Sequence, residues 1–379
     1  MSDRAMSDRS AYGAAGVDYQ TLDAGKRSAL TEALATSALL EARGGQALDA
    51  SRGEPAFAFE LGGQTFGFVL EGLGTKSIIA RALEPELGPA AFGAVAYDTV
   101  AAIVNDLICV GALPLVVNAY FATGASEWYD DQARQAGLLA GWREACEDAG
   151  AVWGGGESPS LPGLVAAADI ELAGCAVGAV PGGGGAILGD ALAAGDQVVL
   201  VASSGLHANG SSLARMIATD LPAGYQTELP SGRAFGDALL DRSVIYVGLV
   251  QALLAAGLPV HYLSHITGHG LLKLMRPRRD FTYRIAELPP VPEVLSFLAE
   301  RAGLSPAAAY STLNMGAGFA VYTGSGSGDE VARIATELGL PAQVAGVVEA
   351  GPRRVILEPV GVTFKSDELD LGPQPGPHE

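Results

Sequence analysis

The chain is poor in lysine and carries a large excess of acidic residues. Its 379 residues have a net charge of −19 and include only four lysines, which are Lys26, Lys76, Lys273 and Lys365. Non-specific binding to nucleic acids or anionic membranes needs a basic surface, so the composition argues against both. An anionic substrate would therefore be bound by local cationic side chains, backbone amides or Mg2+.

Cysteine is also scarce. The three cysteines, Cys109, Cys146 and Cys175, are far apart and form no CxxC pair. This is typical of reduced thiols in a cytoplasmic protein rather than of a disulfide framework or a structural zinc site. The first ten residues lack the apolar segment of a secretory signal. No apolar run is expected to span a bilayer, because polar residues interrupt the longest candidate between 98 and 106.

Patterns typical of strands and helices alternate in both halves of the chain. The length suggests two domains, and the alternation predicts the α/β (α+β) class. The glycine-rich segment at 181–185 is the best candidate linker. We predict a disordered N-terminus at 1–11, an N-terminal domain at 12–180, a C-terminal domain at 186–362 and a tail at 363–379.

Periodicity and turn residues place the main elements. Helices are predicted at 21–43, 130–149 and 239–254, and another helix begins at Ser211. Residues 44–55 are rich in glycine and polar side chains and are predicted to form a loop. Strands are predicted at 57–59, 66–70, 115–120, 151–153, 169–180, 196–201 and 319–322.

The stretch from Asp98 to Gly124 combines an apolar helix with acidic residues. Asp98 is predicted to be the helix N-cap, and Asn105 and Asp106 follow two turns later. A buried carboxylate is unfavourable without a partner, so a cation, a ligand or a hydrogen-bond network is expected there. Residues 115–120 are then predicted to form a buried strand. Asn105 and Asp106 are either close to a metal ion or bonded to the backbone.

Three turns that follow predicted strands bring small and polar residues together. EGLGTK at 71–76 is a plausible phosphate-facing turn, although it lacks the spacing of a Walker A loop. GGGE at 154–157 supplies one carboxylate after a strand. SSGLHANG at 203–210 leads into a helix N-terminus, where amide dipoles favour anions.

Three histidines lie in HYLSHITGHG at 261–270. Their spacing is HxxxHxxxH, which could suggest zinc. The glycines between them and the expected strand and turn do not support a helical metal-binding face, so a zinc site is not predicted.

Seven motifs occur in an order that resembles the phosphoribosylformylglycinamidine cyclo-ligase family, the aminoimidazole ribonucleotide synthetases. They are YGAAGVD at 12–18, EGLGTK at 71–76, DTVAAIVNDLICVGALPLVVNAYFATG at 98–124, GGGE at 154–157, SSGLHANGSSLAR at 203–215, SHITGHG at 264–270 and TLNMGAGF at 312–319. The resemblance implies ATP-dependent closure of formylglycinamidine ribonucleotide to aminoimidazole ribonucleotide through an iminophosphate. It further implies Mg2+, a two-domain fold and a homodimer in which two N-terminal sheets pair into a barrel.

The resemblance and the residue types together suggest roles for individual side chains. The candidate catalytic residues are His207, Glu157 and Lys76. The candidate ATP- or phosphate-binding residues are Gly72, Gly74, Thr75, Lys76, Asp98, Asn209, His265 and Thr267. The candidate metal ligands are Glu71, Asp98 and Asp106, because carboxylate oxygens suit hard cations.

The chain departs from the family pattern at several places, and two of them bear on the expected nucleotide site. Glu71 stands where the family has aspartate, and ASRGEPAFAFEL at 50–61 stands where the family has a glycine-rich loop. Two alternatives therefore remain open. One is a superfamily paralogue that uses ATP to phosphorylate another amide, acid or amine, and the other is a non-catalytic nucleotide-binding dimer.

Overall fold

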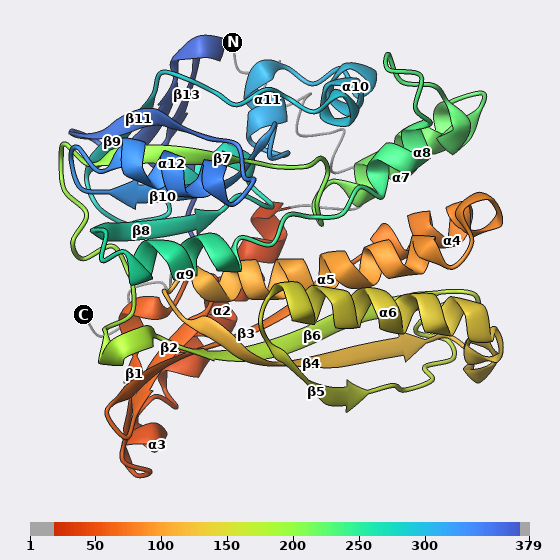
Figure 1. The fold of residues 1–379 in the computed structure, drawn as a ribbon, viewed down its shortest axis with the longest axis horizontal. Helices are drawn as coiled ribbons and strands as arrows, with labels where there is room; N and C mark the ends of the chain where they lie inside the picture. The colour runs from red at the N-terminus through yellow and green to blue at the C-terminus, as the bar shows by residue number, and fades with distance from the viewer. Residues whose placement is uncertain (1–18, 372–379) are drawn as a thin grey trace.

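The computed structural model describes residues 19–371 and contains two β-sheets, one in each half of the chain (Figure 1). The predicted mixed α/β class is confirmed. The predicted disordered segment at 1–11 and the motif at 12–18 lie outside the described residues.

The first half contributes five helices and six strands to the described structure. Its elements are α2 (Tyr19–Leu34), α3 (Ala38–Glu41), β1 (Gly45–Leu48), β2 (Phe57–Leu61), β3 (Gln64–Gly72), α4 (Lys76–Leu87), α5 (Ala90–Ile108), β4 (Leu113–Thr123), α6 (Gln132–Asp148), β5 (Val152–Glu157) and β6 (Ile170–Ala179). The strand order is β1-β2-β3-β6-β4-β5, and only β4 and β5 run parallel among these neighbours.

Helices α5 and α6 cover one face of this sheet, as Figure 1 shows, and leave the opposite face open. Side chains on the open face are well exposed: Leu70 by 70%, Leu115 by 47%, Phe68 by 44% and Tyr120 by 36%. The prediction that 115–120 is a buried strand is therefore wrong for one of its faces. A group of exposed apolar side chains such as this one is typical of an interaction surface.

Helices α5 and α6 approach each other through glycines. A Cβ atom on Gly141 of α6 would lie 2.0 Å from the carbonyl oxygen of Gly93 in α5, and one on Gly137 would lie 2.3 Å from that of Pro89. Any larger residue at these positions would push the helices apart. This close contact holds α5 firmly against α6.

The second half contributes six helices and seven strands to the described structure. Its elements are β7 (Gln197–Ala202), α7 (Ser211–Asp220), α8 (Phe235–Leu239), α9 (Val247–Ala255), β8 (Val260–His265), β9 (Phe281–Ile285), α10 (Glu293–Arg301), α11 (Pro306–Tyr310), β10 (Ala317–Thr323), α12 (Gly328–Glu337), β11 (Ala342–Ala350), β12 (Arg354–Leu357) and β13 (Val362–Lys365). The strand order is β13-β12-β9-β11-β7-β10-β8, and only β12 and β9 run parallel among these neighbours. Because β13 pairs with β12, the second sheet extends beyond residue 362, where the tail was predicted to begin.

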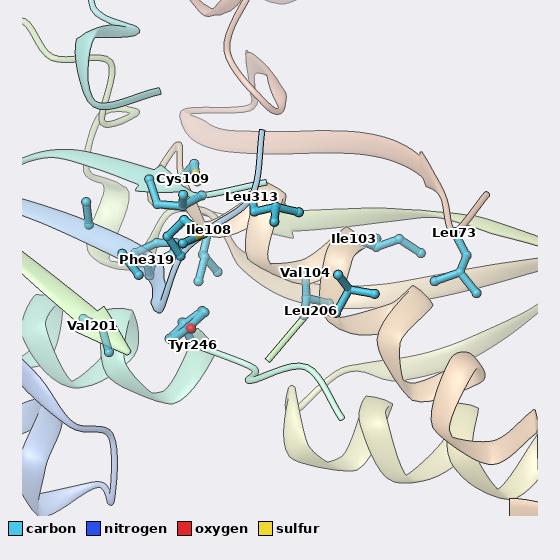
Figure 2. Packing of buried hydrophobic residues seen from close by; sticks show 14 of the residues in the cluster. Leu73, Ile103, Val104, Ile108, Cys109, Val201, Leu206, Tyr246, Leu313 and Phe319 are labelled. Atoms are coloured by element: carbon cyan, nitrogen blue, oxygen red, sulfur yellow. The ribbon is translucent and has the colours of Figure 1, made fainter. Parts of the chain in front are cut away.

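The two halves share one apolar core. Figure 2 shows Val104 and Ile108 of α5 together with Leu206, Tyr246 and Phe319 from the second half, and all five belong to one cluster of buried residues. Helix α5 lies beside α9 and β8 (Figure 1). It is thus buried between the first sheet and the second half.

The length and apolar composition of α5 would allow it to cross a membrane, contrary to the expectation from its polar residues. Its 18-residue apolar window is 100% buried inside the protein. The helix therefore has the properties of a core helix rather than of a lipid-facing one.

The prediction that Asp98 is an N-cap is wrong. Helix α5 begins at Ala90, eight residues earlier, with Pro89 at its N-cap position. The polar side chain interrupts the apolar run for another reason, because Asp98 meets buried partners from other elements. The predicted loop at 44–55 is also partly wrong, since Gly45–Leu48 pairs with β2.

The prediction of one helix over 239–254 fails in its first half. Helix α8 ends at Leu239 and α9 begins at Val247. Between them, the backbone groups of Ser243, Val244 and Tyr246 bond to side chains of α5 instead of forming helical bonds. Tertiary hydrogen bonds have replaced the local ones that the sequence pattern favours.

Candidate functional site

The centre of the site is a fully buried ion pair between Lys76 and Asp98. Lys76 is the first residue of α4, directly after the turn that ends β3. Its ammonium group donates to Asp98 Oδ2 and, over 2.7 Å, to the carbonyl oxygen of His207. The other Asp98 oxygen accepts a 2.6 Å hydrogen bond from the backbone N–H of Ser243. We call Lys76, Asp98, His207 and Ser243 the Lys76 group.

His207 is held in an unusual backbone conformation. Its φ is 57°, in the left-handed region that non-glycine residues rarely adopt, and this conformation accompanies the bond from Lys76 to its carbonyl oxygen. Burial, together with the nearby charges of His265 and Lys76, lowers the pKa of the imidazole to about 3. The ring is therefore neutral at physiological pH.

Three buried polar atoms, two of them on residues of the Lys76 group, have no hydrogen-bond partner among the described residues. They are His207 Nδ1, Ser211 Oγ and Ser243 Oγ. Ser211 is the first residue of α7 and is 4% exposed, as is Ser243. Buried polar groups are nearly always bonded in proteins, so these atoms are the expected contacts of a polar ligand.

A second group of charged residues lies farther along α5. The carboxylate of Asp106 is 2.6 Å from His265 Nδ1, and its charge acts on the carboxyl group of Glu71. Lys273 lies close enough to interact electrostatically with both acids, and it donates to Thr267 Oγ1. We call Glu71, Asp106, His265 and Lys273 the Glu71 group.

The two carboxylates of the Glu71 group compete for ionisation. Burial and the neighbouring charge of Asp106 raise the pKa of Glu71 to about 8. Burial also opposes ionisation of Asp106, but the hydrogen bond from His265 and the charges of His265, Lys273 and Arg276 together outweigh it and lower that pKa. Burial lowers the pKa of Lys273 to about 8. The acids can share a proton, and a hard divalent cation would replace that proton favourably.

Helix α5 fixes the spacing of the two groups. Asp98 and Asp106 are eight residues apart on one helix, which corresponds to about 12 Å along its axis. The three candidate metal ligands Glu71, Asp98 and Asp106 therefore do not meet at one point. Among residues 19–371 no cluster of three or more His, Cys, Asp or Glu side chains could hold a metal ion. Both oxygens of Asp98 are already bonded.

The chain matches models for both domains of one protein family. The model of the N-terminal domain of AIR synthase related proteins matches residues 53–180, and that of the C-terminal domain matches residues 193–358. The phosphoribosylformylglycinamidine cyclo-ligase of Anaeromyxobacter sp. (strain K) is 39% identical over 287 residues, 74% of this chain and 79% of that protein. The chain belongs to this family. As a member of the cyclo-ligase family, it is a ligase that forms C–N bonds.

Solved structures share the fold of the cyclo-ligase family at low sequence identity. Thiamine-monophosphate kinase from Stenotrophomonas maltophilia K279a has a TM-score of 0.57 and 18% identity, covering 80% of this chain and 90% of that one. A hydrogenase maturation protein HypE in complex with ATP has a TM-score of 0.52 and 19% identity, covering 71% and 77%. At such identity these likenesses establish the fold alone.

The turn that the family motif EGLGTK forms lies beside the Lys76 group. Gly72 ends β3, and Gly74 has a φ of 70° that favours glycine. Thr75 is the N-cap residue of α4, and its hydroxyl oxygen is 3.1 Å from that of Ser212 in α7. The turn thus joins the first half to the start of α7.

Asn209 and Thr267 occupy the loops of the second half. Asn209 donates a 2.6 Å hydrogen bond to the carbonyl oxygen of Thr312, and Thr267 accepts from Lys273. Asn209 therefore belongs to the loop before α7, and Thr267 contacts the Glu71 group. The phosphate-binding roles proposed for both remain predictions.

Glu157 is separated from both groups. Across neighbouring strands, Gly72 pairs with Ala173, Ala173 with Tyr120, and Tyr120 with Glu157. Three strand spacings amount to about 14 Å. Glu157 shares the open face with Tyr120, whereas Glu71 faces α5. Within one chain, Glu157 is not brought to the site.

The three histidines of HYLSHITGHG pair with three different acids. His265 bonds to Asp106, His261 Nδ1 is 2.7 Å from Asp196, and His269 Nε2 is 3.0 Å from Asp23. Only His265 belongs to the two groups described above.

Sequence reasoning missed Ser243 and Lys273. Ser243 lies in a segment predicted to be helical, and nothing in its sequence context indicates that its N–H bonds to Asp98. Lys273 could have been found, because it is one of four lysines and follows the SHITGHG motif closely. Asn105 was predicted either to lie close to a metal ion or to bond to the backbone. The structure supports the second alternative, because the Asn105 side chain bonds to backbone groups of Val244 and Tyr246.

Proposed function

We propose that this protein uses ATP and Mg2+ to cyclise formylglycinamidine ribonucleotide to aminoimidazole ribonucleotide. The observation that carries the proposal is the Lys76 group, in which a buried lysine lies among buried polar atoms without partners. Such a site suits an anionic phosphoryl group, because Lys76 supplies charge and the hydroxyls of Ser211 and Ser243 supply hydrogen bonds.

The proposed reaction has two steps. The formyl amide oxygen of the substrate attacks the γ-phosphorus of ATP while the amide nitrogen loses its proton, which gives an iminophosphate and ADP. The neighbouring amidine nitrogen then attacks the iminophosphate carbon, the C–O bond breaks, and phosphate leaves with loss of a proton from the ring nitrogen. Lys76 would neutralise phosphoryl charge, and Asp98 would hold Lys76 in position. Neutral His207 would accept or donate a proton at Nδ1.

The Glu71 group fits a magnesium ion. Mg2+ in nucleotide sites binds one or two carboxylates and completes its shell with phosphate oxygens and water. Glu71 and Asp106 would provide these carboxylates, and bound Mg2+ would supply neutralisation of the triphosphate charge. His265 would orient Asp106, and Thr267 and Lys273 would lie beside the nucleotide. Asp98 is better assigned to Lys76 than to the metal ion.

We further propose a cytoplasmic homodimer in which two N-terminal sheets pair through their open faces, with the domain boundary at 181–185. The exposed row of Phe68, Leu70, Leu115 and Tyr120 supports this, since a second copy would cover it. Glu157 borders the same face, so any catalytic role for it would depend on the partner subunit.

One observation favours an alternative substrate. Residues 51–55 do not form a free glycine-rich loop, because Tyr262 donates a 2.6 Å bond to Glu54 and Arg276 donates a 3.0 Å bond to the Gly53 carbonyl oxygen. A superfamily paralogue that phosphorylates another amide, acid or amine would tolerate such a change. A non-catalytic nucleotide-binding dimer is the remaining alternative.

The deciding experiment mixes purified protein with formylglycinamidine ribonucleotide, ATP and Mg2+ and measures ADP release and imidazole product. A Lys76→Met variant should lose both signals, whereas Arg333→Gln, on the exposed surface of α12, should keep them. Absence of product from the wild type, under conditions where a family member is active, would refute the proposal. Calorimetric ATP binding without product would then favour the alternatives.

A further inference from the structure

A small cavity lies away from the two groups of the proposed site. Its volume is about 190 Å3, and its walls come from four separate segments: residues 50–54, 188–190, 276–279 and the region of 353–371. It therefore lies between the segment that joins β1 to β2, the segment before β7 and the segments that flank β12 and β13. None of the residues assigned above to phosphate transfer lines it.

The cavity walls are rich in arginine. Five of the chain's 19 arginines (23 basic residues minus four lysines) line it, which are Arg52, Arg276, Arg278, Arg279 and Arg353. Two acidic residues, Glu54 and Asp190, share the lining, and Asp370 pairs with Arg278. In a chain with a net charge of −19, this is a local excess of positive charge.

Several acidic neighbours compensate this charge only in part. Burial raises the pKa of Glu54, although the charge of Arg276 and the hydrogen bond from Tyr262 act in the opposite direction. Burial also lowers the pKa of Arg353, and the like charge of Arg278 acts in the same direction. Arg278 and Arg353 thus repel each other, and an anion between them would relieve the repulsion.

Backbone carbonyl groups hold the arginines in place. Arg279 Nη1 donates to the carbonyl oxygens of Gly189 and Leu192 at 3.0 and 2.6 Å, and Arg276 Nε donates to that of Gly53 at 3.0 Å. Arg353 Nε donates to the Met275 carbonyl oxygen at 2.8 Å. The cavity walls are therefore preorganised, which reduces the entropy lost when a ligand binds.

Some of the donors in these walls are not satisfied. Arg52 Nε and Arg276 Nη1 are buried and have no hydrogen-bond partner among the described residues. Guanidinium groups with spare donors are the preferred partners of carboxylate and phosphate oxygens. The cavity is smaller than the roughly 300–1,000 Å3 of sites for drug-sized ligands, so it fits a compact anion rather than a whole nucleotide.

We propose that this cavity is a second anion site, which binds free phosphate or the phosphate group of a small sugar phosphate. Phosphate is favoured over a monocarboxylate because its two negative charges match the excess of arginine in the walls. The site would be independent of the Lys76 group. Since it joins four segments of the chain, an occupied site would also tie the first sheet to the C-terminal strands.

The test titrates the full-length protein with inorganic phosphate and, separately, with ribose 5-phosphate by calorimetry at constant ionic strength. Three variants accompany the wild type. Arg278→Gln changes the cavity, the double variant Lys76→Met/Asp98→Asn changes the proposed active site, and Arg333→Gln is a surface control whose side chain is 51% exposed, against 46% for Arg278. Loss of one charged contact should weaken binding by roughly tenfold or more.

We expect saturable binding of at least one probe that weakens in Arg278→Gln and persists in both Lys76→Met/Asp98→Asn and Arg333→Gln. The probe that binds more tightly identifies the source of the phosphate group. Failure of both probes to bind, or binding that Arg278→Gln leaves unchanged, would overturn the proposal. Binding lost only in Lys76→Met/Asp98→Asn would assign the anion to the active site and would equally overturn the proposal.

Discussion

Lys76→Met should destabilise the protein strongly, because it removes one partner of a fully buried ion pair. The side chains of Lys76 and Asp98 are both 0% exposed. After the substitution, Asp98 keeps only the N–H of Ser243, and its charge is buried without compensation. Breaking a buried pair in this way costs about 3–5 kcal/mol. For domains of 150–250 residues this corresponds to a fall in Tm of roughly 6–20 °C.

Urea unfolding followed by tryptophan fluorescence and circular dichroism measures the effect. The double variant Lys76→Met/Asp98→Asn should recover most of the lost stability, since the introduced amide would be neutral and would still accept from the N–H of Ser243. Arg333→Met breaks only exposed pairs on α12 and should change the free energy of unfolding by less than about 1 kcal/mol. A Lys76→Met variant within about 1 kcal/mol of wild type, or a double variant as unstable as the single one, would refute the reasoning.

Other parts of the molecule give three further predictions. The Glu71 pKa of about 8 exceeds its unfolded value, so the free energy of unfolding without metal should fall as pH rises from about 4.5 to 8. The affinity for Mg2+, measured by calorimetry, should weaken about tenfold for each pH unit below 8. Glu71→Gln should remove both trends. Leu70→Glu should convert the proposed homodimer to a monomer in sedimentation experiments without loss of folded structure, because Leu70 lies on the open face of the first sheet. A wild-type monomer, or a dimer that persists in the variant, would contradict the proposed sheet pairing. Gly141→Ala should destabilise the protein by about 1–3 kcal/mol in urea unfolding, because the added Cβ would clash with Gly93. In the control Gly248→Ala, the added Cβ has no atom within 4 Å, so this change should be neutral or stabilising. Equal effects of the two substitutions would contradict this account.

The sequence predicted much of the fold because the local and tertiary signals agree there. The apolar strands at 66–70 and 169–180 and the amphipathic helix at 130–149 are confirmed as β3, β6 and α6. The N-cap of α6 is one example, since Asp131 accepts bonds from the N–H groups of Ala133 and Arg134 as an isolated helix start would require.

The errors arise where distant residues decide the structure. Asp98 looked like a helix start because a buried acid in mid-helix is unfavourable, and its partner Lys76 is 22 residues away. The segment before α9 looked helical because its pattern is apolar, yet Asp98 and Asn105 bind its backbone from 139 or more residues away. No local pattern carries that information.

The sequence predicted the residue types of the site better than it predicted their arrangement in space. Lys76, Asp98 and His207 do come together, and so do Glu71, Asp106 and His265. Their division into two groups follows from the rise of α5, which becomes relevant only once the start of that helix is known. Glu157 faces away because of strand alternation, a period of two that its glycine-rich neighbours do not reveal.

The bonds from Asp98 and Asn105 to residues 243–246 limit how the protein can move. A hinge rotation of the second half would have to break the hydrogen bonds to Ser243, Val244 and Tyr246 at once. It would also open the apolar core between Ile108 and Phe319. Substrates must therefore enter by local motion of loops, so substitutions in those loops should alter rates of entry and release while the spacing along α5 stays constant.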